Sequence, residues 1–404
     1  MSDPRPPLPR VLFVNHASRM GGAEFILLDI VRGFAGRSSA WLFEDGPLRS
    51  KMEQLGMQTL LPRTQGNLTG IKRDRSLLRA IPKLGEMAAI VRAIATAGRA
   101  HEVVYANSQK AFVLSTFAAA LARRPLIWHL HDILTEAHFG ERQLKLVRIL
   151  ANRFAARVIV PSTAAGAAFV AAGGRKSLLR LVPNGVTLDT DHTDWDDTAR
   201  DDMARARLRA RLGLPSGFVF GVFSRLAPWK GQRVALEALA RLPDASCLIV
   251  GSALFGEDLY EQELRSLAAT LGVTPRVRFL GQRDDVPTLM RAIDVVVHPS
   301  TSPEPFGRTL VEAMLSRTPV IAADSGAAAE ILQGGEAGVL VPPGDPAALA
   351  GALRRLRFQP QIAAGLVERG ERRAREMFSA ARMRAGVEAV TREVATARDE
   401  AAAA

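Results

Sequence analysis

The sequence predicts an α/β protein built from two doubly wound domains, each with a parallel sheet between layers of helices. Continuous apolar runs, such as residues 11–15 and the β-branched run within 292–297, are typical of strands buried on both faces of a parallel sheet. Segments with apolar residues at helical spacing follow such runs, which is the pattern of βαβ units. With 404 residues, the chain is long for one core and long enough for two domains.

Composition and cysteine usage are those of an ordinary globular protein. Hydrophobic residues make up 48% of the chain and aromatic residues 6%, without the signatures of collagen, coiled coils or disorder. Cys247 is the only cysteine, so an intramolecular disulfide is impossible and a reducing cytoplasm is expected. Residues 1–10 lack an apolar stretch of signal-peptide length, and no window approaches a transmembrane span. We therefore expect a cytoplasmic protein that is soluble or peripheral to a membrane.

The net charge of +12 is concentrated in the first half of the chain. Residues 1–190 hold 26 Lys and Arg against 13 Asp and Glu, whereas residues 191–404 hold 27 against 28. This asymmetry favours an anionic partner for the first half. We expect a membrane surface, because the basic residues are not interleaved with the aromatic residues that single-stranded nucleic-acid binders use. The basic amphipathic segment 70–83 is our candidate for that contact, and a solvated basic face is the alternative.

The first strand, residues 11–15, leads into a loop with two adjacent glycines before a helix at about 25–34. Gly21 and Gly22 do not form the dinucleotide fingerprint, which needs three glycines in G-x-G-x-x-G order. Small residues at such a turn let a phosphate approach the backbone at the helix N-terminus. We therefore expect this loop to face a phosphate-bearing ligand, the alternative being a plain turn.

Histidines follow at the end of a later strand. Residues 103–108 form a predicted strand with a polar end, and residues 125–132 form the next, which ends in His129, His131 and Asp132. Ligands of open α/β sheets bind at strand carboxyl ends, so these side chains are candidates for the binding crevice. Alternation places the two histidines on one face, where Asp132 could orient an imidazole. Two alternatives stand beside this interpretation. One is metal binding, although no third or fourth ligand stands at metal spacing, and the other is a histidine that is simply buried in the core.

Two further predicted strands, at 156–162 and 181–186, close the first domain. An Asp- and Thr-rich stretch follows, in which residues 189–191 read Asp-Thr-Asp. We interpret this triplet as solvated linker rather than as a metal site, because it follows a Pro-Asn-Gly turn. A basic helix is expected at 204–212.

The second domain opens with a predicted strand at 218–223, which leads into a basic loop. Arg225 and Lys230 stand in that loop, and a helix follows to about residue 242. A bidentate guanidinium and a point-charge ammonium at a helix entrance suit a diphosphate, whose charge they neutralise. The alternative is that both are exposed loop residues.

A proline-rich turn follows the predicted strand at 292–297. Three prolines between residues 299 and 305 exclude a helix there, and Gly307 allows a bend before a predicted helix at 308–315. Unpaired amides and the positive end of the helix dipole meet at the start of that helix. The turn is therefore expected to bind an anion.

Glu304 and Glu312 frame this turn, one at its mouth and the other inside the helix. They are separated by seven residues that include Pro305-Phe306-Gly307, and this pattern resembles the Glu-x7-Glu signature of retaining GT-B glycosyltransferases of family 4. In that family, the first Glu and the backbone of the Phe-Gly turn hold the donor sugar, and the second Glu binds the ribose hydroxyls. The resemblance covers almost the whole chain. It departs from the family at Arg317, where Gly is usual, and at Gly326-Ala327, where a Gly-Gly pair is usual.

Other motifs acquire roles through the same resemblance. The Gly-Gly loop would lie beneath the donor diphosphate, and residues 277–286 would run along the nucleobase. The resemblance assigns catalytic roles to His131 beside the donor sugar, to Glu304, and to Arg225 and Lys230 on the leaving diphosphate. The residues it assigns to donor binding are Gly21, Gly22, Arg225, Lys230, Gly281, Arg283, Glu304, Phe306, Gly307, Leu310 and Glu312.

The fold implied is GT-B, in which two Rossmann-like domains face each other across a cleft. Residues 1–187 would form the acceptor-side domain, and a helix at about 375–398 would pack back on it. Residues 188–212 would be the linker, and residues 213–374 the domain that binds the donor nucleotide.

The implied reaction is retaining, metal-independent transfer of a hexose from a nucleoside-diphosphate sugar of the GDP-mannose or UDP-glucose type to a glycan acceptor. Since the first half is basic, we expect a lipid-linked acceptor in polysaccharide biosynthesis, at the inner face of the plasma membrane. No cofactor, metal or nucleic-acid partner is expected. The alternatives are a sugar-nucleotide epimerase of the same fold and a non-catalytic protein that binds sugar nucleotides or nucleic acid.

Overall fold

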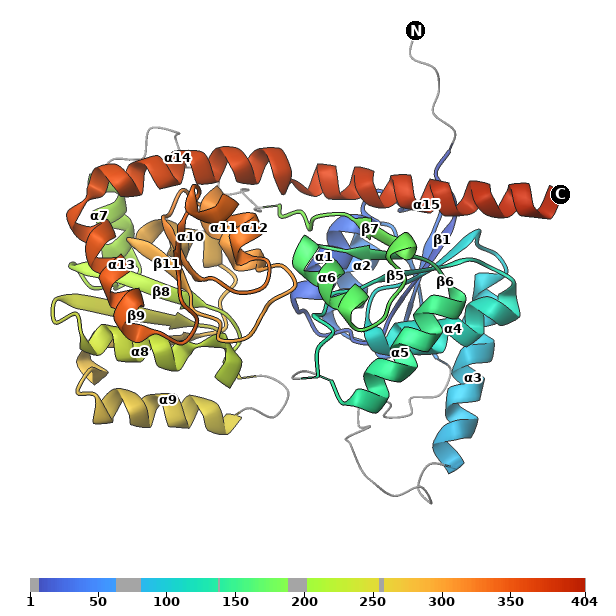
Figure 1. Cartoon of the computed structure of the whole chain (residues 1–404), viewed down its shortest axis with the longest axis horizontal. Coiled ribbons are helices and arrows are strands. Elements are labelled where there is room, and N and C mark those ends of the chain that lie inside the picture. Colours follow the sequence, from blue (N-terminus) through green and yellow to red (C-terminus); the bar gives the residue numbers. More distant parts are fainter. Residues whose placement is uncertain (1–6, 63–80, 137–138, 188–201, 254–257, 404) are drawn as a thin grey trace, which may run out of the picture. The chain divides into compact units, whose positions relative to one another are not determined.

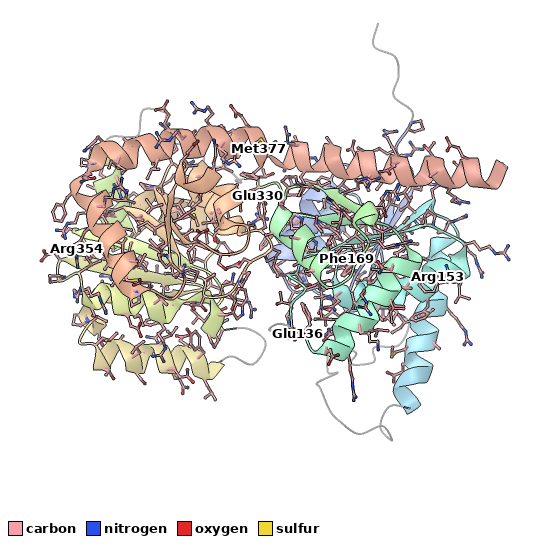
Figure 2. All side chains as sticks on the ribbon, viewed as in Figure 1. Glu136, Arg153, Phe169, Glu330, Arg354 and Met377 are labelled. Carbon is pink, nitrogen blue, oxygen red and sulfur yellow. The ribbon has the colours of Figure 1, made fainter. Side chains whose placement is uncertain are left out.

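The computed structural model describes residues 7–62, 81–136, 139–187, 202–253 and 258–403 (Figure 1). The chain forms two compact units, Met1–Gly185 with Ala380–Ala404, and Val186–Ser379. In each unit, side chains fill the space between a parallel sheet and its helices (Figure 2). Most of the segment 70–83, the candidate for membrane contact, lies outside the described residues.

The first unit contains a seven-stranded parallel sheet in the order β3-β2-β1-β4-β5-β6-β7. Its strands are β1 (Val11–Asn15), β2 (Ser39–Leu42), β3 (Gln58–Leu60), β4 (Val103–Ala106), β5 (Leu126–His129), β6 (Ala155–Val160) and β7 (Leu179–Leu181). Its helices are α1 (Gly22–Val31), α2 (Pro47–Gln54), α3 (Ile81–Gly98), α4 (Gln109–Ala122), α5 (Glu141–Phe154), α6 (Thr163–Ala171) and α15 (Ala380–Ala403), with a 3-10 turn η3 (Lys176–Leu178).

Helices cover both faces of this sheet, so its strands are apolar on both sides. In β1, Leu12 and Val14 pack in the core beneath α3, α4, α5 and α6. The alternate residues Val11 and Phe13 pack on the opposite face against α1, α2 and α15. This two-sided burial explains why the strand reads as a continuous apolar run.

The second unit contains a six-stranded parallel sheet in the order β10-β9-β8-β11-β12-β13. Its strands are β8 (Phe218–Phe223), β9 (Ala245–Val250), β10 (Val277–Gly281), β11 (Val295–His298), β12 (Val320–Ala323) and β13 (Val339–Val341). Its helices are α7 (Asp202–Arg211), α8 (Gln232–Ala240), α9 (Asp258–Thr270), α10 (Val286–Ala292), α11 (Arg308–Leu315), α12 (Ala328–Ile331), α13 (Pro346–Phe358) and α14 (Pro360–Met377), with 3-10 turns η4 (Pro228–Lys230), η5 (Thr274–Arg276) and η6 (Gln333–Gly335).

The segment expected as a linker, residues 188–212, is described only from residue 202. There the chain forms α7, which belongs to the second unit. The guanidinium groups of Arg205 and Arg209 pair with the Asp294 carboxylate at 2.8 and 2.6 Å, and these ion pairs hold α7 next to the start of β11.

The helix expected at 375–398 is interrupted in the structure. Helix α14 ends at Met377 and α15 begins at Ala380. Between them, the Phe378 carbonyl accepts a hydrogen bond from the Val186 amide at 2.8 Å. The break also separates the two units, since α14 packs in the second and α15 in the first.

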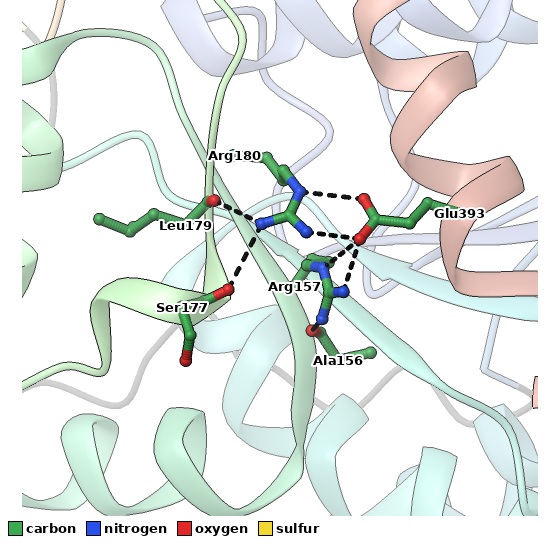
Figure 3. A network of polar contacts seen from close by, with 6 residues as sticks. All are labelled: Ala156, Arg157, Ser177, Leu179, Arg180 and Glu393. Atoms are coloured by element: carbon green, nitrogen blue, oxygen red, sulfur yellow. Dashed lines mark hydrogen bonds and ion pairs between the residues drawn. The ribbon is translucent and has the colours of Figure 1, made fainter. Parts of the chain in front are cut away.

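Helix α15 is fastened to the sheet of the first unit by one glutamate. Arg157 on β6 and Arg180 on β7 both donate to the Glu393 carboxylate, and their Nε atoms lie 2.8 and 2.9 Å from its two oxygens (Figure 3). Hydrogen bonds from Arg180 and Arg157 hold the pKa of Glu393 below its usual range. The C-terminal helix therefore joins the first sheet through charge as well as through apolar packing.

Candidate functional site

Each sheet has one point at which the order of its strands reverses. In the second unit, β8 lies between β9 and β11, and in the first unit β1 lies between β2 and β4. Loops diverge at the carboxyl ends of the strands on either side of such a point and leave room for a ligand. In the second unit these are the loops that carry Arg225, Lys230 and Glu304.

Glu304 lies in the loop after β11, and the residue is 8% exposed. Its Oε2 accepts a hydrogen bond from Lys230 Nζ at 2.7 Å, and its Oε1 lies 2.9 Å from His298 Nε2 and also accepts from the Ser300 hydroxyl. Burial by itself raises the pKa of Glu304. The charges and hydrogen bonds of His298 and Lys230 outweigh burial and hold the pKa well below its usual range. The carboxylate is therefore ionised at neutral pH and can only accept hydrogen bonds.

Two glycines let the backbone approach this loop closely. A Cβ on Gly231, whose φ is +73°, would lie 1.9 Å from the Pro299 carbonyl oxygen. A Cβ on Gly326, whose φ is +61°, would lie 2.3 Å from the Glu304 carbonyl oxygen. The amide of Ala327 donates to that same carbonyl at 3.0 Å. Alanine at the second position of the expected Gly-Gly pair therefore still makes the backbone contact.

The ring of Trp229 holds the two candidate diphosphate ligands side by side. The guanidinium carbon of Arg225 lies 5.1 Å and the Nζ of Lys230 4.4 Å from the centre of the indole. The Trp229 carbonyl accepts from the amide of Thr301 at 2.9 Å, which joins the loop after β8 to the loop after β11. The site residues predicted from sequence do not include this tryptophan, although it stands between the two basic residues of the loop.

The turn before α11 is built as the prolines and Gly307 predict. Gly307 has a φ of +105° and begins the helix without a side-chain cap, so the amides of the first turn are not taken by a capping residue. Phe306 and Leu310 lie in the core, where Phe306 packs edge-on against Phe378. Neither side chain is therefore available to a ligand at this turn, and the Leu310 amide donates to the Gly307 carbonyl at 3.0 Å.

Glu312 lies within α11, and Arg317 follows the end of that helix. The Glu312 carboxylate accepts from Arg308 Nε at 2.7 Å, within the same helix. Arg317 adopts a φ of +58°, a left-handed conformation in which glycine is free of strain. Arg317 thus keeps the backbone geometry that the family's usual glycine would have, and its Nε pairs with Glu371 at 3.2 Å.

Gly281 ends the edge strand β10 and Arg283 follows it, and β9 separates this strand from β8. Gly281 has a φ of +63°, and its carbonyl accepts from the Gly251 amide at 2.8 Å. Arg283 is exposed and forms two hydrogen bonds with Asp285, at 2.8 and 2.7 Å. These residues lie two strands away from the strand that leads to Arg225 and Lys230.

In the first unit, His131 follows β5 and belongs to a chain of hydrogen-bonded polar side chains. Its Nε2 lies 2.9 Å from Asn107 Oδ1, and Asn107 donates to Asn15 Oδ1 at 3.2 Å. Asn15 in turn donates to the Glu24 carboxylate at 3.1 Å. Burial lowers the pKa of His131 to about 3 and raises that of Glu24. The site residues predicted from sequence include neither asparagine, although both stand near the carboxyl end of a predicted strand.

The alternative of a core histidine applies to His129. This residue is fully buried, its Nδ1 lies 2.7 Å from the Tyr105 hydroxyl, and burial holds its pKa well below the usual range. Its ring centre lies 3.9 Å from that of His131, so both rings occupy one face of the strand, as alternation predicts.

The two glycines of the first loop differ in the space around them. Gly21 precedes α1 in an extended conformation, and a Cβ there would lie 2.9 Å from a Glu24 carboxylate oxygen. A Cβ on Gly22 would meet open space. Of the two glycines, only Gly21 is therefore crowded.

The part of the chain that the structure describes holds neither a candidate membrane span nor a candidate metal cluster. None of the helices in that part of the chain is both long and apolar enough to cross a bilayer. The same residues contain no group of three or more His, Cys, Asp or Glu side chains placed to hold a metal ion.

Both units match known protein families. Residues 21–185 match the glycosyl transferase 4-like domain, and residues 205–373 match the glycosyl transferases of group 1. The structure of Anabaena HepE in complex with UDP is 36% identical, with a TM-score of 0.82, over 95% of this chain and 100% of that chain. The chain belongs to the group 1 glycosyltransferases. This GT-B glycosyltransferase is of the family 4 type, and the prediction of two doubly wound Rossmann-like domains is confirmed.

Curated relatives of this glycosyltransferase include two mannosyltransferases. The phosphatidyl-myo-inositol mannosyltransferase of Mycobacterium leprae is 33% identical over 62% of this chain and 63% of the relative. The lipopolysaccharide core biosynthesis mannosyltransferase LpcC of Rhizobium leguminosarum bv. viciae is 30% identical over 52% of this chain and 58% of the relative. The match thus spans about three fifths of the length of each relative.

Proposed function

We propose that this chain transfers a hexose from a nucleoside-diphosphate sugar to a glycan acceptor, with retention and without a metal ion. The observation that carries the proposal is the Lys230–Glu304 pair at the point where the second sheet reverses its strand order. It brings an ammonium and an ionised carboxylate to the position where open α/β sheets bind ligands. Arg225 lies beside the pair, on the ring of Trp229.

The proposed chemistry is electrostatic. Arg225 and Lys230 neutralise the diphosphate as it leaves, which is the task that a metal ion performs in other transferases. Glu304 accepts hydrogen bonds from hydroxyls of the donor sugar, since its ionised carboxylate has no proton to give. Glu312 binds the ribose hydroxyls, which requires its carboxylate to share or release the hydrogen bond from Arg308.

Two donors are the first to test. HepE, which is 36% identical to this chain, has been crystallised with UDP and with UDP-glucose, which supports a donor of the UDP-glucose type. The mannosyltransferases among the curated relatives support GDP-mannose instead. The two donors differ in the base and at a single sugar hydroxyl, so a binding assay separates them.

The test is thermal-shift binding with UDP-glucose, GDP-mannose and related sugar nucleotides, with and without a chelator. We expect one donor to stabilise the wild type, to act unchanged in chelator, and to lose its effect in Lys230→Ala and Glu312→Ala. Lys51→Ala, at an exposed lysine of the first unit, is the matched control and should respond as the wild type does. Loss of stabilisation in chelator would refute metal independence, and no response to any sugar nucleotide would refute the site.

Turnover separates the alternatives. A transferase hydrolyses its donor slowly when no acceptor is present, an epimerase converts one sugar nucleotide into another, and a non-catalytic binding protein does neither. The anomeric configuration of the product, read by NMR, decides whether transfer proceeds with retention.

We further propose that the acceptor is lipid-linked and that α4 and α5 rest on an anionic membrane. These neighbouring helices pack on one face of the first sheet. Phe117 and Leu121 of α4 are 48% and 55% exposed, and Leu146 and Ile149 of α5 are 48% and 50% exposed. The same α5 contains four basic residues and one acidic residue, with Arg153 near its end (Figure 2). Apolar side chains among basic ones are complementary to an anionic bilayer surface.

Vesicle co-sedimentation tests this surface. Wild type should bind vesicles that contain anionic lipid, and the Leu146→Ser/Ile149→Ser variant should bind several-fold less. Phe358→Ser is the control, because Phe358 is 70% exposed but lies in the second unit. Equal binding to neutral and anionic vesicles, or by wild type and the double variant, would contradict the proposal.

A further inference from the structure

The side chain of Gln232 closes the basic loop that follows β8. Gln232 is the first residue of α8 and is fully buried. Its Nε2 donates to the Arg225 carbonyl at 2.9 Å and to the Ser224 hydroxyl, also at 2.9 Å. Arg225 and Lys230 both stand in the loop between Ser224 and Gln232. The amide of Gln232 therefore joins the start of this loop to its end.

The Arg225 carbonyl needs such a partner because of its place in the second sheet. The amides of Ser224 and Leu226 donate at 3.0 Å each to carbonyl groups on the β9 side. Peptide groups alternate in direction along a strand, so the Arg225 carbonyl points to the other side, that of β11. The pairing of β8 with β11 ends at Val222 and Val297, before Arg225 is reached. The side chain of Gln232 thus fills the place that a neighbouring strand would have.

The orientation of the Gln232 amide follows from its partners. A backbone carbonyl can only accept a hydrogen bond, so the NH₂ group must face Arg225. Oε1 of Gln232 has no hydrogen-bond partner among the residues that the structure describes. It is therefore the NH₂ group, and not Oε1, that connects this side chain to the loop.

We propose that Gln232 is a positioning residue, which holds the backbone of Arg225 so that Arg225 and Lys230 present their charges together to a diphosphate. The two cations lie 5.1 and 4.4 Å from the centre of the same Trp229 ring, although like charges repel. Fixing the Arg225 carbonyl fixes the Cα from which the guanidinium extends, so less ordering remains when the anion binds. The hydrogen bonds of Gln232 need no ligand, whereas the diphosphate rests on the proposed function.

Fluorine NMR of the full-length protein, labelled with 5-fluorotryptophan, reports on this loop without a ligand. The chain has four tryptophans, and Trp229→Phe identifies the signal of Trp229. Methionine is similar in length to glutamine but has no donor. In Gln232→Met the Trp229 signal should therefore shift or broaden, while the other signals stay in place. An unchanged Trp229 signal in folded Gln232→Met would overturn the inference.

Isothermal titration with UDP and GDP measures the consequence for binding. Gln232→Met should bind the nucleotide that wild type prefers about 10-fold more weakly, because the two cations must then be ordered by the ligand. Thr318→Val is the matched control. Thr318 is also buried, donates to the Met290 carbonyl at 2.8 Å, and precedes β12 at the amino end of the same sheet.

The control separates positioning from a general loss of stability. Thr318→Val should unfold more easily than wild type, as Gln232→Met should, but should keep the affinity and the Trp229 signal of wild type. Equal weakening of nucleotide binding in the two variants would make Gln232 a structural residue only. A Trp229 signal that moves in Gln232→Met without any change in affinity would also refute the inference.

Gln232→Glu is a second variant, which keeps the shape of the side chain and Oε1 but replaces the NH₂ group by oxygen. A carboxylate is favourable in the first turn of a helix, which supports folding of this variant. Its Trp229 signal should move as in Gln232→Met, and an unmoved signal would contradict the role of the NH₂ group. Wild type that binds neither nucleotide would count against the proposed function, while the Trp229 signals would still decide the inference. Equally tight binding by wild type and Gln232→Met would refute the inference and leave the proposed function standing.

Discussion

Lys230 Nζ lies 2.7 Å from Glu304 Oε2, and both side chains are largely shielded from solvent. His298 and Ser300 occupy the other oxygen of the carboxylate. Lysine is thus the partner of one oxygen, and the loops after β8 and β11 are coupled through this pair. Removing one partner of a buried ion pair lowers the free energy of unfolding, so the contribution of this pair to stability can be measured.

Replacing Lys230 by Met should destabilise the second unit by about 3 kcal/mol at neutral pH, because the buried Glu304 carboxylate loses the partner of its Oε2 and keeps only His298 and Ser300 at Oε1. The pKa of Glu304 is lowered in the folded protein, so its stabilising effect exists above the unfolded pKa of about 4.3 and disappears as the pH falls below it. The difference between wild type and variant should therefore hold from neutral pH down to about pH 5 and shrink as the pH falls further toward the lowered pKa of Glu304. Denaturant unfolding at several pH values measures it.

The companion measurement is a double-mutant cycle. Lys230→Met/Glu304→Gln should lose less stability than the two single variants together, because neither buried charge then stands alone. Strict additivity, or a difference that stays constant with pH, would show that the pair is not coupled.

Gly231→Ala should destabilise the protein by about 3 kcal/mol or more. The new Cβ would overlap the Pro299 carbonyl, and the alanine would have to keep the left-handed φ of Gly231. Gly272→Ala is the matched control: its φ is +67°, close to the +73° of Gly231, but a Cβ there meets open space. The control should lose only about 1 kcal/mol. Similar losses in both variants, measured by thermal or denaturant unfolding, would mean that φ alone matters at Gly231.

Arg317 permits a test of the family's usual glycine. Arg317→Gly relieves a left-handed conformation but loses the ion pair with Glu371, so the free energy of unfolding should change by less than about 0.5 kcal/mol. Arg317→Ala keeps the strained φ and loses the same ion pair, and should be about 1 kcal/mol less stable than the glycine variant. An alanine variant as stable as the glycine variant would mean that Arg317 is unstrained.

The parts of this molecule that were predictable from sequence are those specified by local patterns. Buried parallel strands read as apolar runs, and the prolines before Gly307 made the turn that carries Glu304 recognisable. Alternation placed His129 and His131 on one face. Sequence could not say which of the two is a core residue, since that depends on how completely Tyr105 and the neighbouring strands cover His129.

The parts that sequence missed depend on residues far apart in the chain. Asn15 and Asn107 are separated by 92 positions, and only the adjacency of β1 and β4 brings them together. The interruption of the C-terminal helix depends on the contact between Phe378 and Val186. Neither long-range contact leaves a periodic signal in the sequence.

Trp229 gives the last prediction. Its ring holds Arg225 and Lys230, so removing it should leave two long side chains to be ordered when a diphosphate binds. Isothermal titration with UDP and GDP should show about 10-fold weaker binding of the preferred nucleotide by Trp229→Ala and a smaller loss by Trp229→Phe, which retains a ring. Phe218→Leu is the control, since that ring lies 5.8 Å from Arg357 at the opposite end of β8 and should not affect binding. Unchanged affinity in Trp229→Ala would mean that Arg225 and Lys230 bind the nucleotide without support from an aromatic ring. Equal losses in the alanine and phenylalanine variants would mean that the indole contributes something other than its ring face.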